Sequence, residues 1–133
     1  MSLKKSPVTF VATSDLCAIT KGRAVLTEDL KAGGSTGWVP ANLGIGASGQ
    51  IVDQIPFGST GDLRLAPDPS TERVISGVPG RPDTAMVLAD IVTTDGQPWA
   101  CCPRTFLRES VRTLREEFGL TMESAFEHEF MAL

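Results

Sequence analysis

The sequence of 133 residues contains no tyrosine, one histidine and three cysteines. With a single histidine, the sequence indicates no Ser–His–acid catalytic set beyond a chance combination of residues. The cysteines are odd in number and Cys101 is adjacent to Cys102, so neither a disulfide framework nor a zinc knuckle fits. These features favour a reduced protein, and we expect it in the cytoplasm.

Clustered basic charge, long apolar runs and phosphate-binding motifs are also lacking. The net charge is −4 and the sequence pI is about 4.9, which disfavours a nucleic-acid or anionic-membrane surface. No apolar run is long enough for a membrane span. The glycine-rich stretch does not open a helix, as a dinucleotide-binding fingerprint requires. We therefore expect neither nucleic acid nor membrane as a partner.

The pattern of the chain predicts a sheet. At 41% hydrophobic and 21% charged residues, the composition is that of an ordinary globular domain. Residues 85–92 form the most continuous apolar run and are predicted to be a central strand. Asp95-Gly96 indicates a hairpin turn after it, and Lys21-Gly22 indicates an earlier turn. Further strands are predicted at residues 7–13, 16–19, 23–26 and 62–65.

One long helix is predicted from Pro103 to the residue before Gly119. Proline suits a first helical position and glycine the position that ends a helix. Apolar residues recur at helical spacing on one face: Leu107, Val111, Leu114 and Phe118. We expect this face to lie on the core, which gives an α+β fold with a helix across a mixed sheet.

A glycine-rich loop spans residues 33–61, with a short helical turn before it at residues 27–31 and a strand expected at 50–55. Loops this long within a compact domain are uncommon and often functional. Trp38 argues against plain disorder, and two interpretations stay open. It either pins the loop onto its own domain or helps present a surface to a partner subunit.

Glu127 and Glu129 lie two residues apart in a final predicted strand, residues 122–133. Side chains alternate along a strand, so both carboxylates share one face at a separation of about 6.6 Å. Such a pair could hold two hard cations, which lie about 3.5–4 Å apart in two-metal sites. On its own, the pattern is more typical of a solvated strand face.

Taken together, the motifs resemble the amino-terminal part of the glutamine synthetase family. The resemblance depends on the order and spacing of several segments: Gly22-Arg23, the run Gly61-Asp62-Leu63-Arg64-Leu65-Ala66-Pro67-Asp68-Pro69-Ser70-Thr71, Ala89-Asp90-Ile91, Asp95-Gly96-Gln97-Pro98-Trp99, Pro103-Arg104 and Glu127-His128-Glu129-Phe130.

The resemblance implies a β-grasp domain at residues 7–119 and the first strand of a catalytic domain at residues 120–133. Family members are ligases that join an amine to the γ-carboxylate of glutamate, using ATP to form γ-glutamyl phosphate. Glu127 and Glu129 would be ligands of Mg²⁺ or Mn²⁺. The subunits form a homo-oligomeric ring, in which the β-grasp domain closes the neighbouring active site. No catalytic residue falls within this stretch, so by itself it is expected to be inactive and without a cofactor.

The sequence departs from the family in the loop that usually carries an ammonium-binding aspartate. Here the loop reads Gly37-Trp38-Val39-Pro40-Ala41-Asn42 and has no acid. The sequence of this loop is more similar to that of the family branch that makes γ-glutamyl amides of larger amines such as polyamines. Trp38 and Asn42 are candidate contacts with substrate or neighbour. Two alternatives remain: a stand-alone β-grasp binding or assembly module, and a family member that has lost catalysis.

Overall fold

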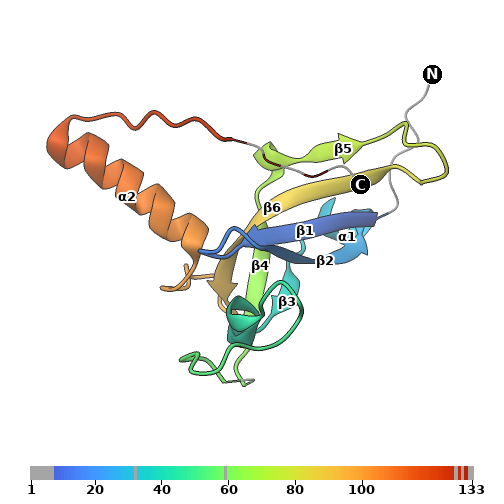
Figure 1. Cartoon of the computed structure of the whole chain (residues 1–133), viewed down its shortest axis with the longest axis horizontal. Helices are drawn as coiled ribbons and strands as arrows, with labels where there is room; N and C mark the ends of the chain where they lie inside the picture. The colour runs from blue at the N-terminus through green and yellow to red at the C-terminus, as the bar shows by residue number, and fades with distance from the viewer. Residues whose placement is uncertain (1–7, 32, 59, 128, 130, 132–133) are drawn as a thin grey trace.

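The computed structural model describes residues 8–31, 33–58, 60–127, 129 and 131 (Figure 1). Six strands, two helices and two 3₁₀ turns follow one another within this part of the chain. In order they are β1 (Val8–Ser14), β2 (Thr20–Leu26), α1 (Thr27–Lys31), β3 (Thr36–Trp38), η1 (Pro40–Gly44), β4 (Leu63–Pro67), η2 (Pro69–Thr71), β5 (Arg73–Ile75), β6 (Thr84–Thr93) and α2 (Pro103–Phe118).

The strands form one mixed sheet in the order β2-β1-β6-β4-β3, with β5 also paired to β6. β1 and β6 are parallel, with Val11 opposite Val87, whereas the other strand pairs are antiparallel. The central strand expected at residues 85–92 is therefore confirmed as β6. The mixed sheet and its single long helix also confirm the α+β fold class.

The core lies on one face of the sheet. Alternate residues of β6 point into it, and Ala89 and Ile91 are completely buried, as the period of two requires for a half-buried strand. The cluster includes residues from every part of the sheet except β2 and β5: Val11, Trp38, Leu63, Leu65, Val87, Ala89, Ile91 and Cys102.

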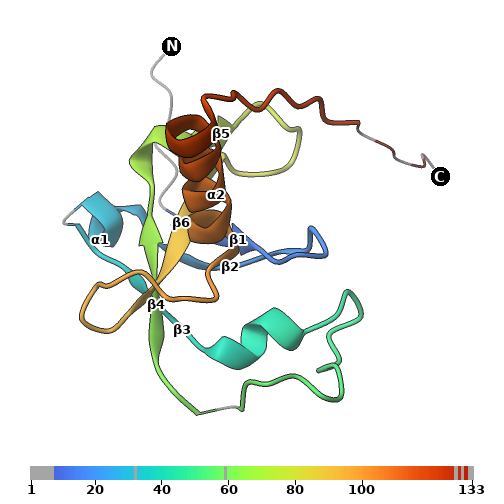
Figure 2. The same cartoon turned by 90° about the vertical axis from the view of Figure 1, so that its left-hand side faces the viewer.

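Curling of the sheet brings its two ends together, although β2 and β3 are farthest apart in strand order (Figure 2). The Nζ of Lys21 in β2 lies 3.5 Å from the carbonyl oxygen of Leu43 in η1. The guanidinium of Arg23 lies 3.9 Å from where a Cβ on Gly37 would be. The loop after β3 is thus folded back over the β2 end.

The turn expected at Lys21-Gly22 is wrong. β2 runs unbroken through both residues, and the chain reverses earlier, where Asp15 accepts hydrogen bonds from the backbone N–H groups of Cys17 and Ile19. Glycine is needed at position 22 because a Cβ there would lie 2.1 Å from the carbonyl oxygen of Val11. That close approach is a tertiary constraint, which local composition does not reveal.

The glycine-rich loop is more structured than expected at its start and less so at its end. It contains β3 and η1, but residues 50–55 form no strand; an isolated bridge joins Ile45 to Ile51. The turn at Asp95-Gly96 is confirmed, with Thr93 donating its backbone N–H to Gln97. Its return segment forms a single bridge between Val92 and Pro98 rather than a strand.

Helix α2 forms where predicted, and Gly119 ends it in the left-handed conformation at φ 64°. The expectation that its apolar face lies on the core is wrong: none of its residues is buried. Phe106, Leu107 and Phe118 are 68%, 55% and 66% exposed. Figure 1 shows the helix leaving the sheet at its first turn and pointing away.

The final strand expected at residues 122–133 is not formed in the described part of that segment. Residues 120–127, 129 and 131 have no regular secondary structure and are exposed. A strand needs a neighbour for its backbone hydrogen bonds, and the segment has none within the described residues.

Candidate functional site

Glu127 and Glu129 are exposed and take part in no ion pair among the described residues. His128 and Phe130 of the same motif lie outside the described residues. The described chain also brings together no group of three acidic, histidine or cysteine side chains that could hold a metal ion. Two carboxylates fit the oxygen ligands that Mg²⁺ prefers, but further ligands would have to come from elsewhere.

The other two candidates, Trp38 and Asn42, are brought together in one pocket of about 330 Å³. We call it the β2–loop pocket, because it lies between β2 and the loop that follows β3. Its lining residues are Lys21, Gly22, Arg23, Trp38, Asn42 and Ile45. None of them is acidic.

Trp38 is buried in the core of its own domain, where only 4% of the residue's surface is exposed. This supports the interpretation that it pins the loop, since a side chain so buried presents little surface to another subunit. Its indole N–H is buried without a hydrogen-bond partner in the described structure. Buried polar groups normally have partners, so this donor is an exception among the described residues.

Lys21 is held by a partly buried ion pair. Its Nζ lies 2.6 Å from Asp15, and the side chains are 11% and 9% exposed. Burial raises the pKa of the Asp15 carboxyl, but the hydrogen bonds from Lys21 and the Ile19 and Cys17 backbone outweigh it, so the pKa lies below its usual value. The charge of Lys21 is thereby neutralised locally.

Arg23 and Asn42 differ from Lys21, because neither side chain makes a hydrogen bond or ion pair within the described residues. Sequence reasoning used Arg23 as a family motif but did not predict it as a site residue. The available signal was a basic residue directly after an obligatory glycine. What placed it at the pocket was the curl of the sheet.

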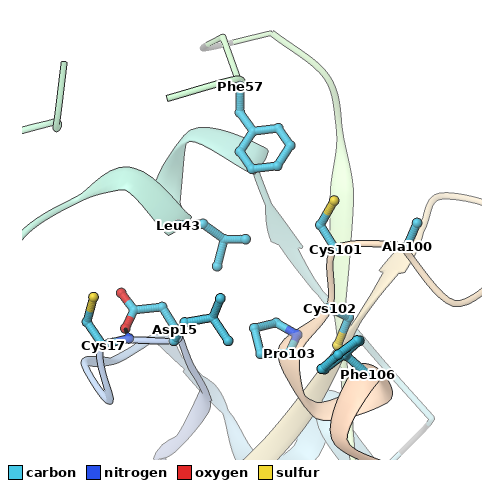
Figure 3. A pocket seen from close by; sticks show the side chains of 10 residues that line it. Asp15, Cys17, Leu43, Phe57, Ala100, Cys101, Cys102, Pro103 and Phe106 are labelled. Atoms are coloured by element: carbon cyan, nitrogen blue, oxygen red, sulfur yellow. Dashed lines mark hydrogen bonds between the residues drawn. The ribbon is translucent and has the colours of Figure 1, made fainter. Parts of the chain in front are cut away.

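A second pocket, of about 420 Å³, is mostly apolar (Figure 3). Leu43, Phe57 and Phe106 surround it, and the thiols of Cys17 and Cys101 lie on its two sides. The ring of Phe57 contacts Trp99 at 5.2 Å between centroids. Phe106 joins this pocket to the exposed apolar face of α2. The sequence did not predict it, because its walls come from four separate segments.

Charged residues from three of the sequence motifs meet where α2 leaves the sheet. Arg104 pairs with Asp68 and Asp90 at 3.0 Å each, and Arg108 pairs with Asp90 at 2.5 Å. Hydrogen bonds from Ser70, together with the charge of Arg104, lower the pKa of the Asp68 carboxyl. These ion pairs therefore hold the N-terminal end of α2 against the sheet. They give a structural reason for the spacing of the motifs.

The architecture is that of a small α+β domain with a curled mixed sheet and one projecting helix. It superimposes on a crystal structure described as a novel glutamine synthase homologue, with a TM-score of 0.74 and 36% identity, covering 88% of this chain and 28% of that one. The family model of the glutamine synthetase N-terminal domain matches residues 3–99. The chain belongs to the glutamine synthetase family, as its N-terminal domain.

Two curated relatives show how much of the family the chain represents. It is 28% identical over 131 residues to a glutamine synthetase of Methanosarcina mazei, covering 97% of this chain and 28% of the relative. It is 32% identical over 124 residues to a gamma-glutamylpolyamine synthetase of Streptomyces coelicolor, covering 91% and 26%. The chain thus spans less than a third of these relatives. Its described helices include none that is long and apolar enough to cross a membrane.

Proposed function

We propose that this chain is the N-terminal domain of a cytoplasmic, ATP-dependent ligase that forms a γ-glutamyl amide from glutamate and an amine. The family match over residues 3–99 is the observation that carries the proposal. The relatives are synthetases several times longer than this chain. Nucleotide binding and chemistry would therefore belong to the remainder of the protein, and residues 120–133 would begin that catalytic part.

The exposed face of α2 supports a domain that belongs to a larger body. Phe106, Leu107 and Phe118 are on the helix, and Leu120 and Met122 follow it, all about half exposed or more. Contiguous exposed apolar surface of this kind is typical of an interface. We propose that the catalytic part covers this face, and that in a homo-oligomer the loop side of the domain closes the neighbouring subunit's active site.

Glu127 and Glu129 are the proposed metal ligands. Carboxylates from a strand of the catalytic part would hold Mg²⁺ or Mn²⁺, which supplies charge neutralisation for the phosphates of ATP. Within this chain they lie in an exposed segment that lacks the rest of a ligand set among the described residues. We therefore propose that the 133-residue chain alone is inactive.

The composition of the β2–loop pocket supports an acceptor other than free ammonium. An ammonium ion needs a carboxylate as charge partner and proton acceptor, and no pocket-lining residue is acidic. A larger amine, bound by other parts of the protein, is the proposed acceptor.

The test is phosphate release by the intact protein, with glutamate plus ammonium compared with glutamate plus putrescine. We expect putrescine to support faster turnover; a large preference for ammonium would contradict the proposed acceptor. The double variant Glu127→Ala/Glu129→Ala should lose metal-dependent turnover, and unchanged activity would mean that the ligands are misassigned. Glutamate-dependent ATP hydrolysis by the 133-residue chain would show that catalysis does not need the remainder.

A stand-alone binding or assembly module is the second candidate, favoured by the same exposed face of α2. The coding sequence beyond residue 133 discriminates between the two. A stop codon at that point supports the module, whereas continuation into a long open reading frame supports the ligase. If the long protein forms but shows no glutamate-dependent ATP hydrolysis, a family member without catalysis is the remaining interpretation.

A further inference from the structure

We propose that the β2–loop pocket is a binding site for a small oxyanion, a carboxylate or a phosphate, with Arg23 as its charge anchor. The inference does not depend on the ligase reaction, because it follows from the groups that line the pocket.

The position of Arg23 is the first argument. It extends from β2 toward Gly37 of β3, across the gap where the curled sheet brings its two ends together. Arginine on a protein surface is commonly matched by a carboxylate, yet Arg23 has no acidic partner in the described structure. Its guanidinium presents a planar fork of donors that matches a carboxylate or phosphate in bidentate geometry.

A neighbouring group also offers donors. The side-chain amide of Asn42 is unengaged among the described residues and supplies two further donors. An oxyanion entering the pocket would provide acceptors for the donors of Arg23 and Asn42, which an amine cation cannot do. Trp38 lines the pocket, so its indole N–H resonance reports on a ligand bound there, although the N–H itself is buried.

The charge of the pocket favours the same ligand class. Asp15 neutralises Lys21 at 2.6 Å, but Asp15 does not line the pocket. The remaining charge is therefore the positive charge of Arg23. A volume of about 330 Å³ has room for a small anion with several oxygens, and partial enclosure by Trp38 and Ile45 reduces the solvent screening of the ion pair.

The experiment is a titration of the ¹⁵N-labelled 133-residue chain, followed through the indole N–H resonance of Trp38. Only two tryptophans are present, so the variant Trp99→Phe assigns the signal. One arm uses inorganic phosphate and another glutarate, with sodium chloride at matched ionic strength as reference. We expect a saturable shift with phosphate or glutarate and none with chloride. The anion that binds more tightly identifies the source of the oxyanion.

The variants Arg23→Gln and Arg81→Gln make a matched pair. Both remove one exposed arginine, but Arg81 lies in the turn before β6 and not at the pocket. Arg23→Gln should weaken binding at least tenfold, and Arg81→Gln should leave it unchanged. Arg23→Lys, which keeps the charge and loses the fork, should give an intermediate affinity.

The proposal is overturned if neither anion gives a saturable shift, or if Arg23→Gln binds as well as the parent chain. It is also overturned if both glutamine variants weaken binding equally, because the effect would then be one of net charge. Thermal unfolding of each variant shows whether it is folded. If Arg23→Gln does not fold, Asn42→Asp replaces it: the added carboxylate should abolish binding, and unchanged affinity contradicts the site.

Discussion

The central strand β6 and the helix α2 have equally clear apolar patterns, but the apolar face of β6 is buried and that of α2 is exposed. Ile91 of β6 is completely buried, whereas Leu107 of α2 is 55% exposed. The strand finds its partners, β1 and β4, within the same chain. The helix pairs with the sheet near its start, through Arg104 and Arg108, and none of its residues is buried. Under the proposed function, its apolar face is covered by the catalytic part of the protein. An amphipathic pattern specifies that a face is to be covered, but not by what.

The largest expected effect on stability comes from truncating a buried side chain of β6. Ile91→Ala removes side-chain atoms from a fully buried site and should lower the free energy of unfolding by about 3 kcal/mol. Leu107→Ala should change it by no more than about 0.5 kcal/mol, because the site is exposed and alanine favours helix. Urea denaturation of the two variants measures both. Equal losses would show that the helix face is packed in this chain.

A second pair of variants tests the curl of the sheet. A Cβ at Gly22 would lie 2.1 Å from the backbone of Val11, so Gly22→Ala should destabilise by about 2–3 kcal/mol. At Gly37, the nearest atom is the movable guanidinium of Arg23 at 3.9 Å, and Gly37→Ala should have little effect. Thermal unfolding distinguishes them; equal stability of both variants would mean that β1 and β2 lie farther apart.

Local signals predicted the elements that local chemistry controls. Alternation predicted β4, runs of apolar and β-branched residues predicted β1 and β6, and the proline and glycine at its ends predicted α2. The turn at Lys21-Gly22 failed because the glycine serves a contact with another strand, not a reversal of the chain. The β2–loop pocket could be predicted only in part: Trp38 and Asn42 stood out in the loop, whereas Lys21 and Arg23 joined them through the curl of the sheet.

Ion pairs join the start of α2 to the sheet. Their contribution to stability should be smaller than that of the buried core and should depend on the salt concentration. Arg104→Gln removes two ion pairs at the root of α2. It should lower the Tm by a few degrees at low salt and by less at high salt, because partly exposed pairs are screened. Arg112→Gln also removes two ion pairs, but both lie within the helix. Its effect should be smaller, and an equal loss would show that Arg104 does not join helix to sheet.

The smallest expected effect is a pH dependence of stability that arises from the Asp15–Lys21 ion pair. The pKa of Asp15 is lowered when the chain folds, so its ion pair with Lys21 adds stability above the ordinary value of about 3.8 and loses it as the pH falls through the lowered value. Asp15→Asn should therefore flatten the loss of stability below pH 4, measured by urea unfolding at several pH values. Asp53→Asn, in the exposed loop, should leave the profile unchanged. If Asp15→Asn leaves the acid limb as steep as in the parent chain, other carboxylates control acid sensitivity, the Asp68 pairing at the root of α2 being the next to test.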